Sequence, residues 1–394
     1  MSRFTRRQFI STALLAPAAF RQTSDERFLS TVPLGRARGA SGAPLERLLG
    51  RGLNARLFMD LSTIAKDDPR TQVIPNERFF IRTAAPSQLP RDIGADAWTI
   101  DVGGLVRAPA QIAVASLDAL GTRSGRYLLE CSGNTDPANY GLLSAADWDG
   151  VPLTPLLDRV RPSASLGRRS LGEGGVWRVL VSGLDDDQDP AGTSVPGASW
   201  IFSRDDLQRA LLVTKMNGAP LPRDHGSPVR LIVPGWYGCA CIKWVHRVEL
   251  VADDAPPTSQ MLEFAARTHQ SGKPPLARDF IPAVIDTAAV PVRVEKWINR
   301  GGIFYRIVGI LWGGTSSPGP TNALSIRFRS NLPWTRVEDC PLPASTDTWS
   351  VWTHTWRPES PGRYTIVLRV DDKSIRTRRL DLFFYAREID IDEI

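Results

Sequence analysis

The sequence predicts an α+β fold, with a mixed α/β domain followed by a smaller β-sandwich. The chain has 394 residues, which gives room for about two domains. Strand-like and short helical patterns alternate over residues 61–255, whereas residues 280–394 read almost entirely as strands. Between them, Pro256-Pro257 and Pro274-Pro275 bracket residues 256–279, which we interpret as a loop-like linker.

The first twenty residues have the pattern of an export signal. Thr5-Arg6-Arg7-Gln8-Phe9 is a twin-arginine motif, an apolar run from Ile10 to Phe20 follows it, and Ala16-Pro17-Ala18 resembles a cleavage site. The apolar run is too short to span a bilayer. We therefore expect residues 1–20 to direct the chain through the twin-arginine machinery to the periplasm. That route carries folded proteins, which suits a cofactor inserted before export.

After the signal, residues 21–60 have weak periodicity and are expected to be an extended lead-in with a short helix. The elements of the mixed domain follow from alternation and turn chemistry. We expect strands over residues 98–102, 126–131, 176–181, 229–233 and 242–251, helices over residues 116–120 and 207–212, and a tight turn at Asn217-Gly218.

The C-terminal part has the spacing of a small β-sandwich. Its strand-like runs cover residues 305–311, 324–329, 349–356 and 364–370, with turn signals between them. Residues 280–394 therefore form the second predicted domain.

Composition excludes several classes of function. The formal net charge is +6, and it falls to about +3 when Arg3, Arg6 and Arg7 leave with the signal. This charge is too small to indicate nucleic-acid binding. Four cysteines are too few for a disulfide scaffold. The sequence contains no Cys-x-x-Cys motif, so it gives no sign of a c-type haem, a zinc site or an iron–sulfur site. The four histidines are too scattered for a polyhistidine metal site.

The most informative feature is Cys131, which directly follows the strand ending in Leu128-Leu129-Glu130 and precedes the small turn Ser132-Gly133-Asn134. A thiol there could be a nucleophile, half of a disulfide, buried filler or a soft metal ligand. By itself, a free cysteine is most often a buried structural residue.

Further motifs change that balance. They are Phe79-Phe80-Ile81-Arg82-Thr83, Ser182-Gly183-Leu184-Asp185, Pro222-Arg223-Asp224-His225-Gly226-Ser227-Pro228-Val229-Arg230 and Pro234-Gly235-Trp236-Tyr237-Gly238-Cys239-Ala240-Cys241-Ile242-Lys243-Trp244. Each has an ordinary structural interpretation when taken alone. Their order, and the spacing of His225, Arg230 and Lys243, are explained together by one shared site.

In this order the motifs resemble the sulfite oxidase family of molybdopterin-dependent oxidoreductases, over residues 75–250. The resemblance continues into that family's immunoglobulin-like dimerisation domain through residues 307–314 and 349–352. It implies a sulfite-oxidase-like molybdopterin-binding domain over residues 61–255, an immunoglobulin-like dimerisation domain over residues 280–394, and a homodimer.

The resemblance also assigns roles. Cys131 would ligate molybdenum beside the two dithiolene sulfurs of one molybdopterin, a soft ligand for a sulfur-rich centre. Arg82 would orient an anionic substrate. The expected cofactor contacts are Phe80, Arg82, Thr83, Asp185, His225, Arg230, Cys241, Ile242 and Lys243. Among these, Asp185 would accept from pterin N–H groups, and His225, Arg230 and Lys243 would hold the pterin phosphate.

The substrate pocket departs from the family's pattern. Ala84 replaces a histidine, Asp136 replaces the second arginine of the pocket, and Ala138 stands where a tryptophan is expected. The family's Arg-Asp-Tyr is absent near Phe264 to His269. The cofactor frame is thus retained while the oxyanion pocket is rebuilt.

The combined interpretation is a periplasmic molybdenum oxidoreductase acting on a small sulfur compound, with oxidation of sulfite to sulfate as the leading candidate. Electrons would pass to a separate carrier, expected to be a c-type cytochrome. Reduction of an S-oxide or N-oxide is the nearest alternative. Two other classes remain open at this point: a cysteine hydrolase or transpeptidase using Cys131 or Cys239 with His225 as base, and a cofactor-free binding protein.

Overall fold

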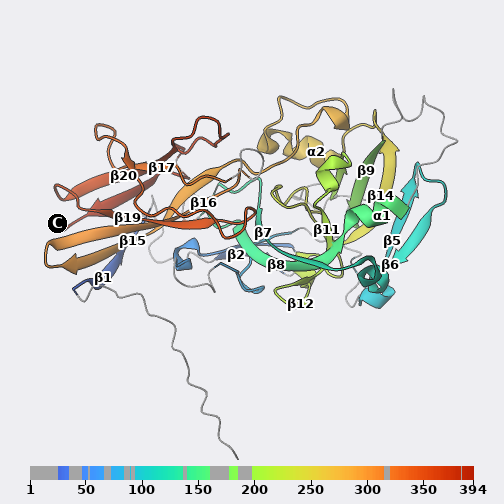
Figure 1. Cartoon of the computed structure of the whole chain (residues 1–394), viewed down its shortest axis with the longest axis horizontal. Helices are drawn as coiled ribbons and strands as arrows, with labels where there is room; N and C mark the ends of the chain where they lie inside the picture. The colour runs from blue at the N-terminus through green and yellow to red at the C-terminus, as the bar shows by residue number, and fades with distance from the viewer. Residues whose placement is uncertain are drawn as a thin grey trace, which may run out of the picture.

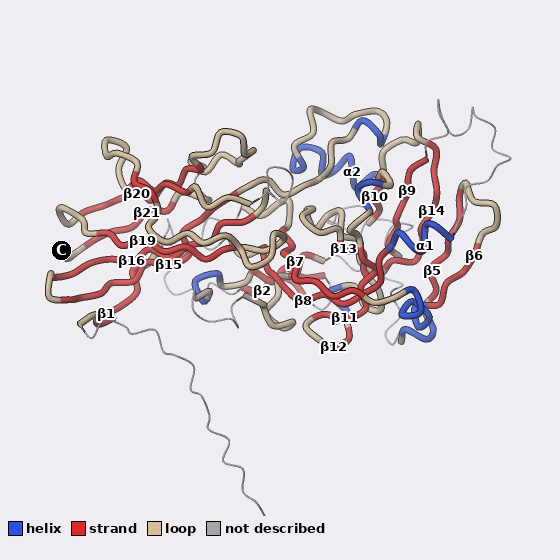
Figure 2. Tube along the Cα trace, in the orientation of Figure 1, coloured by secondary structure: helices blue, strands red, loops and turns tan. Residues whose placement is uncertain are grey.

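A computed structural model describes residues 25–34, 47–51, 54–65, 72–83, 89, 94–135, 140–159, 177–184, 198–314, 320–382 and 384–394. The molecule is elongated, with the C-terminal strands at one end and the mixed domain at the other (Figure 1). Figure 2 shows that strands dominate and that the helices are short. This is the expected α+β class.

The mixed domain is built on two sheets. One has the order β10-β9-β14-β5-β6, with β14 and β5 parallel and its other neighbours antiparallel. Its strands are β5 (Thr99–Gly104), β6 (Ala110–Ala113), β9 (Trp177–Gly183), β10 (Ser199–Phe202) and β14 (Val245–Ala252). The helix α1 (Leu153–Arg159) follows the second sheet's strand β8 directly in the chain.

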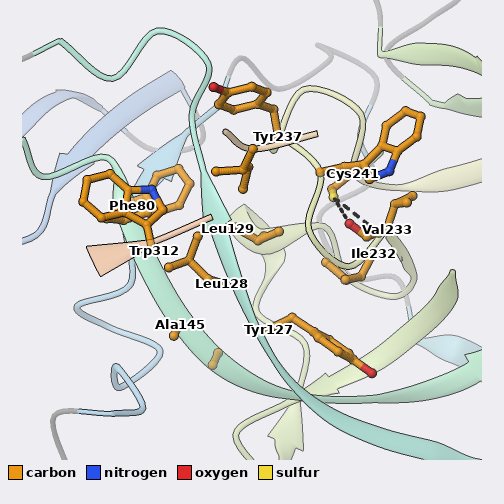
Figure 3. Packing of buried hydrophobic residues seen from close by; sticks show 14 of the residues in the cluster. Phe80, Tyr127, Leu128, Leu129, Ala145, Ile232, Val233, Tyr237, Cys241 and Trp312 are labelled. Atoms are coloured by element: carbon orange, nitrogen blue, oxygen red, sulfur yellow. Dashed lines mark hydrogen bonds between the residues drawn. The ribbon is translucent and has the colours of Figure 1, made fainter. Parts of the chain in front are cut away.

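The second sheet carries the strand that ends at Cys131. Its order is β12-β11-β8-β7, with β13 also paired to β11. The strands are β7 (Arg123–Glu130), β8 (Leu143–Pro152), β11 (Leu211–Met216), β12 (Ala219–Pro220) and β13 (Arg230–Ile232). Figure 3 shows Leu128 and Leu129 of β7 packed among buried neighbours that include Phe80 and Trp312.

The C-terminal strands form two further sheets, with orders β1-β15-β16-β19 and β18-β17-β20-β21. In β20, Tyr364, Ile366 and Leu368 are buried while the residues between them are more exposed, which is the period-two pattern of a sandwich strand. The strands are β15 (Ala288–Asn299), β16 (Gly302–Trp312), β17 (Leu324–Arg327), β18 (Thr335–Arg336), β19 (Ser350–Trp356), β20 (Gly362–Val370) and β21 (Arg387–Ile391).

The lead-in, residues 21–60, supplies strands to two separate sheets. β1 (Arg27–Val32) pairs antiparallel with β15 of the C-terminal sheet. β2 (Arg47–Arg51) and β3 (Asn54–Phe58) form a small sheet with β4 (Ile81–Arg82). The described residues of this segment contain no helix, and residues 35–46 and 52–53 lie outside the described part, so the expected short helix stays a prediction.

Three local predictions need correction. The predicted helix over residues 207–212 is wrong, because Leu211, Leu212 and Val213 belong to β11 and are buried between β8 and β13. The strand expected from residue 242 begins only at Val245. The segment 256–279, expected to be a loop, contains the helix α2 (Ser259–Phe264), capped by Thr258 Oγ1, which accepts from the Met261 N–H.

Within the described ranges, no helix combines the length and the apolar character needed to cross a membrane.

Candidate active site

Cys131 lies at the end of β7 in a turn that the chain holds firmly. Its backbone N–H donates to Leu142 O (3.0 Å), and its carbonyl accepts from Asn134 N–H (2.9 Å). The buried Asn134 side chain accepts from Leu142 N–H and donates to Tyr140 O, each at 3.1 Å. The Ser-Gly-Asn sequence therefore holds the turn that follows β7 in one conformation beside the sulfur.

The Cys131 thiol lines a cavity with about 860 Å³ of empty space, its open mouth included. Segments far apart in the sequence form the walls, including β4, the loop 237–244 and α2. Its lining residues are Phe79, Phe80, Arg82, Thr83, Cys131, Ser132, Ala198, Arg230, Gly238, Cys239, Cys241, Ile242, Lys243, Trp244, Gln260 and Phe264.

Most of the predicted site residues therefore meet in one place. Phe80, Arg82, Thr83, Cys131, Arg230, Cys241, Ile242 and Lys243 all line the cavity. Asp185, together with the altered positions Ala84, Asp136 and Ala138, lies outside the described residues. Leu184, the last described residue before that gap, donates its N–H to Trp244 O (3.0 Å) in the cavity wall.

One part of the cavity is basic. Lys243 Nζ donates to Thr83 Oγ1 and to the backbone oxygen of Asp224. Arg230 is 4% exposed, and its guanidinium donates to the carbonyls of Cys241 (3.2 Å) and His225 (3.3 Å). Burial lowers the pKa of Arg230 to about 10, which still leaves it charged at neutral pH. Anion binding there would complete the hydrogen bonding of cations that now face backbone oxygens.

His225 lies behind this wall and is not among the lining residues. It ends the 3-10 helix Arg223–His225, its Nε2 lies 3.3 Å from Asn76 O, and Phe79 packs edge-on against its ring. Burial and, next, the charges of Lys243 and Arg230 lower its pKa to about 3. With this pKa the ring is neutral at pH 7, and its contact with a phosphate stays a prediction.

The thiols in the cavity are protonated in the absence of a ligand. Burial raises the pKa of Cys131, although the Gly133 N–H, Arg82 and Arg267 oppose the effect. Burial likewise raises the pKa of Cys239 and of Cys241. A hydrolase would need a thiolate within hydrogen-bond reach of an imidazole. His225 instead contacts Asn76 O, so the geometry does not favour that class.

Two arginines that the sequence did not single out lie near Arg82. Arg56 of β3 is directly opposite Arg82 of β4 in the antiparallel register. A methyl group added at Gly133 would lie 3.4 Å from Arg267 Nη1 and 3.9 Å from Cys131 Sγ, so both groups reach the same side of the turn. Arg267 also lies over the ring of Phe264, a lining residue, with its Cζ 5.5 Å from the ring centroid.

These three guanidinium groups interact as like charges. Burial lowers the pKa of Arg82, and the positive charges of Arg56 and Arg267 lower it further. Among the described residues, none of the three forms an ion pair with a carboxylate. This cluster, defined as Arg56, Arg82 and Arg267, therefore concentrates positive charge near Cys131, which suits an anion. Its sequence signal was weak, because Arg56 lies in the lead-in and Arg267 in the presumed linker.

The residues present fit a molybdopterin cofactor. The soft thiol of Cys131, the guanidinium of Arg82 and a separate pair of cations, Arg230 and Lys243, line one cavity. The described residues contain no group of three or more His, Cys, Asp or Glu that could hold a metal ion by themselves.

Comparisons with known proteins agree with this fit. Residues 86–259 match the family model for the oxidoreductase molybdopterin binding domain. The rat mitochondrial sulfite oxidase is 26% identical, over 71% of this chain and 52% of its own length. Chicken sulfite oxidase is 30% identical, over 48% of this chain and 42% of its own length. A Neurospora crassa NADPH nitrate reductase is 34% identical over 38% of this chain and 16% of its own length.

The chain thus spans about half of the rat enzyme, the longest of these matches. Among solved structures, the sulfane dehydrogenase SoxCD from Paracoccus pantotrophus superposes with a TM-score of 0.60. That match covers 98% of this chain and 96% of the other at 15% sequence identity, so it supports the fold.

Proposed function

We propose that the chain is a periplasmic enzyme of the sulfite oxidase family of molybdopterin-dependent oxidoreductases, and that it transfers an oxygen atom to or from a small sulfur compound. The leading reaction is the oxidation of sulfite to sulfate. One observation carries the proposal: Cys131 shares a cavity with Arg82 and with the cations Arg230 and Lys243.

The residues around the cavity divide into three roles. Cys131 supplies the soft protein ligand, and Arg230 and Lys243 supply charge for the pterin phosphate. Thr83, Phe80, Cys241 and Ile242 offer the remaining contacts along the cofactor, with Asp185 and His225 as further proposed contacts. When bound, the molybdenum cofactor supplies the two-electron oxygen-transfer chemistry, and the protein binds, orients and neutralises.

Charge argues for an anionic substrate. Three guanidinium groups without a carboxylate partner among the described residues would bind a doubly charged oxyanion, whereas a neutral S-oxide or N-oxide would leave their repulsion uncompensated. In this proposal, Arg56 and Arg267 take over the role of the arginine that Asp136 replaces. Reduction of an S-oxide or N-oxide therefore ranks second.

The proposal also includes the location of the enzyme, its electron acceptor and its oligomeric state. The twin-arginine motif supports export with the cofactor already in place. The chain would pass electrons to an external c-type cytochrome, and residues 280–394 would mediate a homodimer.

Metal analysis tests the proposal directly. Protein from a molybdenum-competent host is expected to contain about one molybdenum per chain, and Cys131→Ser is expected to lose most of it, because removing the thiolate removes the only proposed protein ligand. Cys340→Ser is the control, since Cys340 lies in the C-terminal domain away from the cavity. Equal molybdenum content in both variants would refute the assignment. Metal-free native protein would favour a binding protein, and His225-dependent activity without metal would favour a hydrolase.

A further inference from the structure

Glu130, the residue immediately before Cys131, is a completely buried carboxylate. It ends β7, and none of its surface is exposed. Its backbone oxygen accepts from Gly238 N–H (2.8 Å), and the next N–H in the chain, that of Cys131, donates to Leu142 O. The position of Glu130 therefore determines the position of the Cys131 backbone, from which the sulfur projects.

The C-terminal domain supplies most of the partners of this carboxylate. Arg378 makes a two-pronged ion pair with it, Nη1 to Oε1 and Nη2 to Oε2, both at 2.6 Å. Trp312 Nε1 donates to Oε2 at 2.8 Å. Tyr140, from the mixed domain, donates its hydroxyl to Oε1 at 2.9 Å.

Arg378 is held in turn. Its side chain is 9% exposed, and Nη1 also donates to the hydroxyls of Tyr140 (2.8 Å) and Tyr385 (2.9 Å). Both Nη atoms of Arg378 are hydrogen-bonded, whereas its buried Nε has no partner among the described residues. A buried, paired charge of this kind resists movement because displacement would separate it from its carboxylate.

Stability alone is a weak reason for such a pair, because apolar residues of similar volume often stabilise a buried site equally well. Its placement suggests another role. We propose that Arg378 and Trp312 are positioning residues for Cys131, so that the C-terminal domain sets the place and the electrostatic surroundings of the metal-ligating sulfur. This inference rests on the proposed function, since it takes Cys131 to be the ligand.

The test uses Glu130→Gln, Arg378→Gln and Arg378→Lys in the full chain. Arg293→Gln is the matched control, because Arg293 also joins the domains, through Nη1 to Ile64 O (2.8 Å), without touching β7. Three quantities are measured: molybdenum per chain, the Mo(V) electron paramagnetic resonance spectrum, and the rate of iodoacetamide alkylation of Cys131 in cofactor-free protein.

Glu130→Gln and Arg378→Gln are expected to keep the molybdenum content within about twofold of the native value. Both variants should alter the Mo(V) resonance spectrum, and they should lower kcat about tenfold while KM stays nearly unchanged. The alkylation rate of Cys131 should change severalfold, and Arg378→Lys should restore part of each property. Arg293→Gln should leave all of them unchanged.

A native spectrum and a native alkylation rate in Glu130→Gln would overturn the positioning role. That variant is nearly isosteric, so it decides the question even if Arg378→Gln fails to fold. If the native protein binds no molybdenum, the proposed function fails, while the alkylation comparison still decides whether Glu130 and Arg378 position the thiol.

Discussion

At the scale of single residues, charge and burial define the chemistry of the cavity. Arg267 lies beside the Cys131 turn without a carboxylate partner among the described residues, and Arg230 keeps its charge although it is almost completely buried. His225, only five residues before Arg230, is held neutral by the same surroundings. Within this motif, Arg230 is thus charged at neutral pH, whereas His225 is uncharged.

Arg267→Met should raise KM for sulfite about tenfold and change kcat less, because one charge-assisted contact to the anion is lost. KM for a neutral substrate such as methionine sulfoxide should not change. Steady-state kinetics on both substrates measure the difference, with Arg107→Met, an exposed arginine on the same domain, as the control. An equal effect on both substrates would exclude a role in anion recognition.

His225 should make the cofactor-free protein sensitive to acid. Its pKa is about 3 in the folded chain and about 6.5 when unfolded, so below pH 6.5 only the unfolded chain takes up the proton. Stability is therefore lost as the pH falls towards 3, by up to about 1.4 kcal/mol per pH unit.

Urea unfolding at pH 7 and pH 5 measures this effect. His225→Gln should lose about 2 kcal/mol less between the two values than the parent chain does. An identical pH dependence in both proteins would contradict a buried, neutral His225.

At the scale of elements, the turn after the 3-10 helix Arg223–His225 packs closely against Lys243, a residue that lines the cavity. Gly226 has a φ of +109°, and a Cβ there would lie 3.0 Å from the Lys243 Cβ. Glycine is needed at this position for its backbone angle and also for its lack of a side chain.

Gly226→Ala should therefore destabilise the chain by about 2 kcal/mol, and Gly218→Ala by about 1 kcal/mol. Gly218 is the matched control, because its φ is also positive (+75°) but nothing lies within 4 Å of an added Cβ. Urea unfolding of both variants gives the comparison. Equal destabilisation would mean that contact with Lys243 does not constrain the turn.

At the scale of the whole molecule, the first strand of the chain stabilises the last domain. β1 lies against β15, a strand of twelve residues, and covers an edge that would otherwise be open. The Arg306–Glu26 ion pair (3.0 Å) and the contact of Phe28 with Trp297 add to this pairing. Cleavage of a signal near residue 20 would leave β1 in place.

A chain beginning at residue 35 should accordingly have a Tm about 5–10 °C lower than a chain beginning at residue 25, and should aggregate on heating. Differential scanning calorimetry and light scattering provide the measurement. If both chains melt alike, the β1 pairing contributes little to stability.

Local patterns predicted much of the architecture. Alternation located the strands of the C-terminal domain, and the strand-turn pattern around Cys131 marked part of the cavity wall. The helix over residues 207–212 was predicted from the capping pattern of Ser203-Arg204-Asp205-Asp206. That pattern is present, because Ser203 Oγ accepts from the Asp206 N–H (3.1 Å) and Asp206 Oδ2 accepts from the Ser203 N–H (2.8 Å), but it begins only the short 3-10 helix Asp205–Leu207. From Leu211 the chain pairs with β8 and β13 instead, which a local capping pattern does not reveal.

The sequence by itself determined the kind of chemistry: a soft thiol after a strand, basic groups at fixed spacing and an export motif are all local properties of the chain. The tertiary structure alone decided which distant groups surround that thiol. It placed Arg56 opposite Arg82, Arg267 beside Gly133, and Arg378, 248 residues away in the sequence, on Glu130. The physical reason is that strand register and the burial of paired charges depend on the packing of the whole molecule, which local periodicity does not specify.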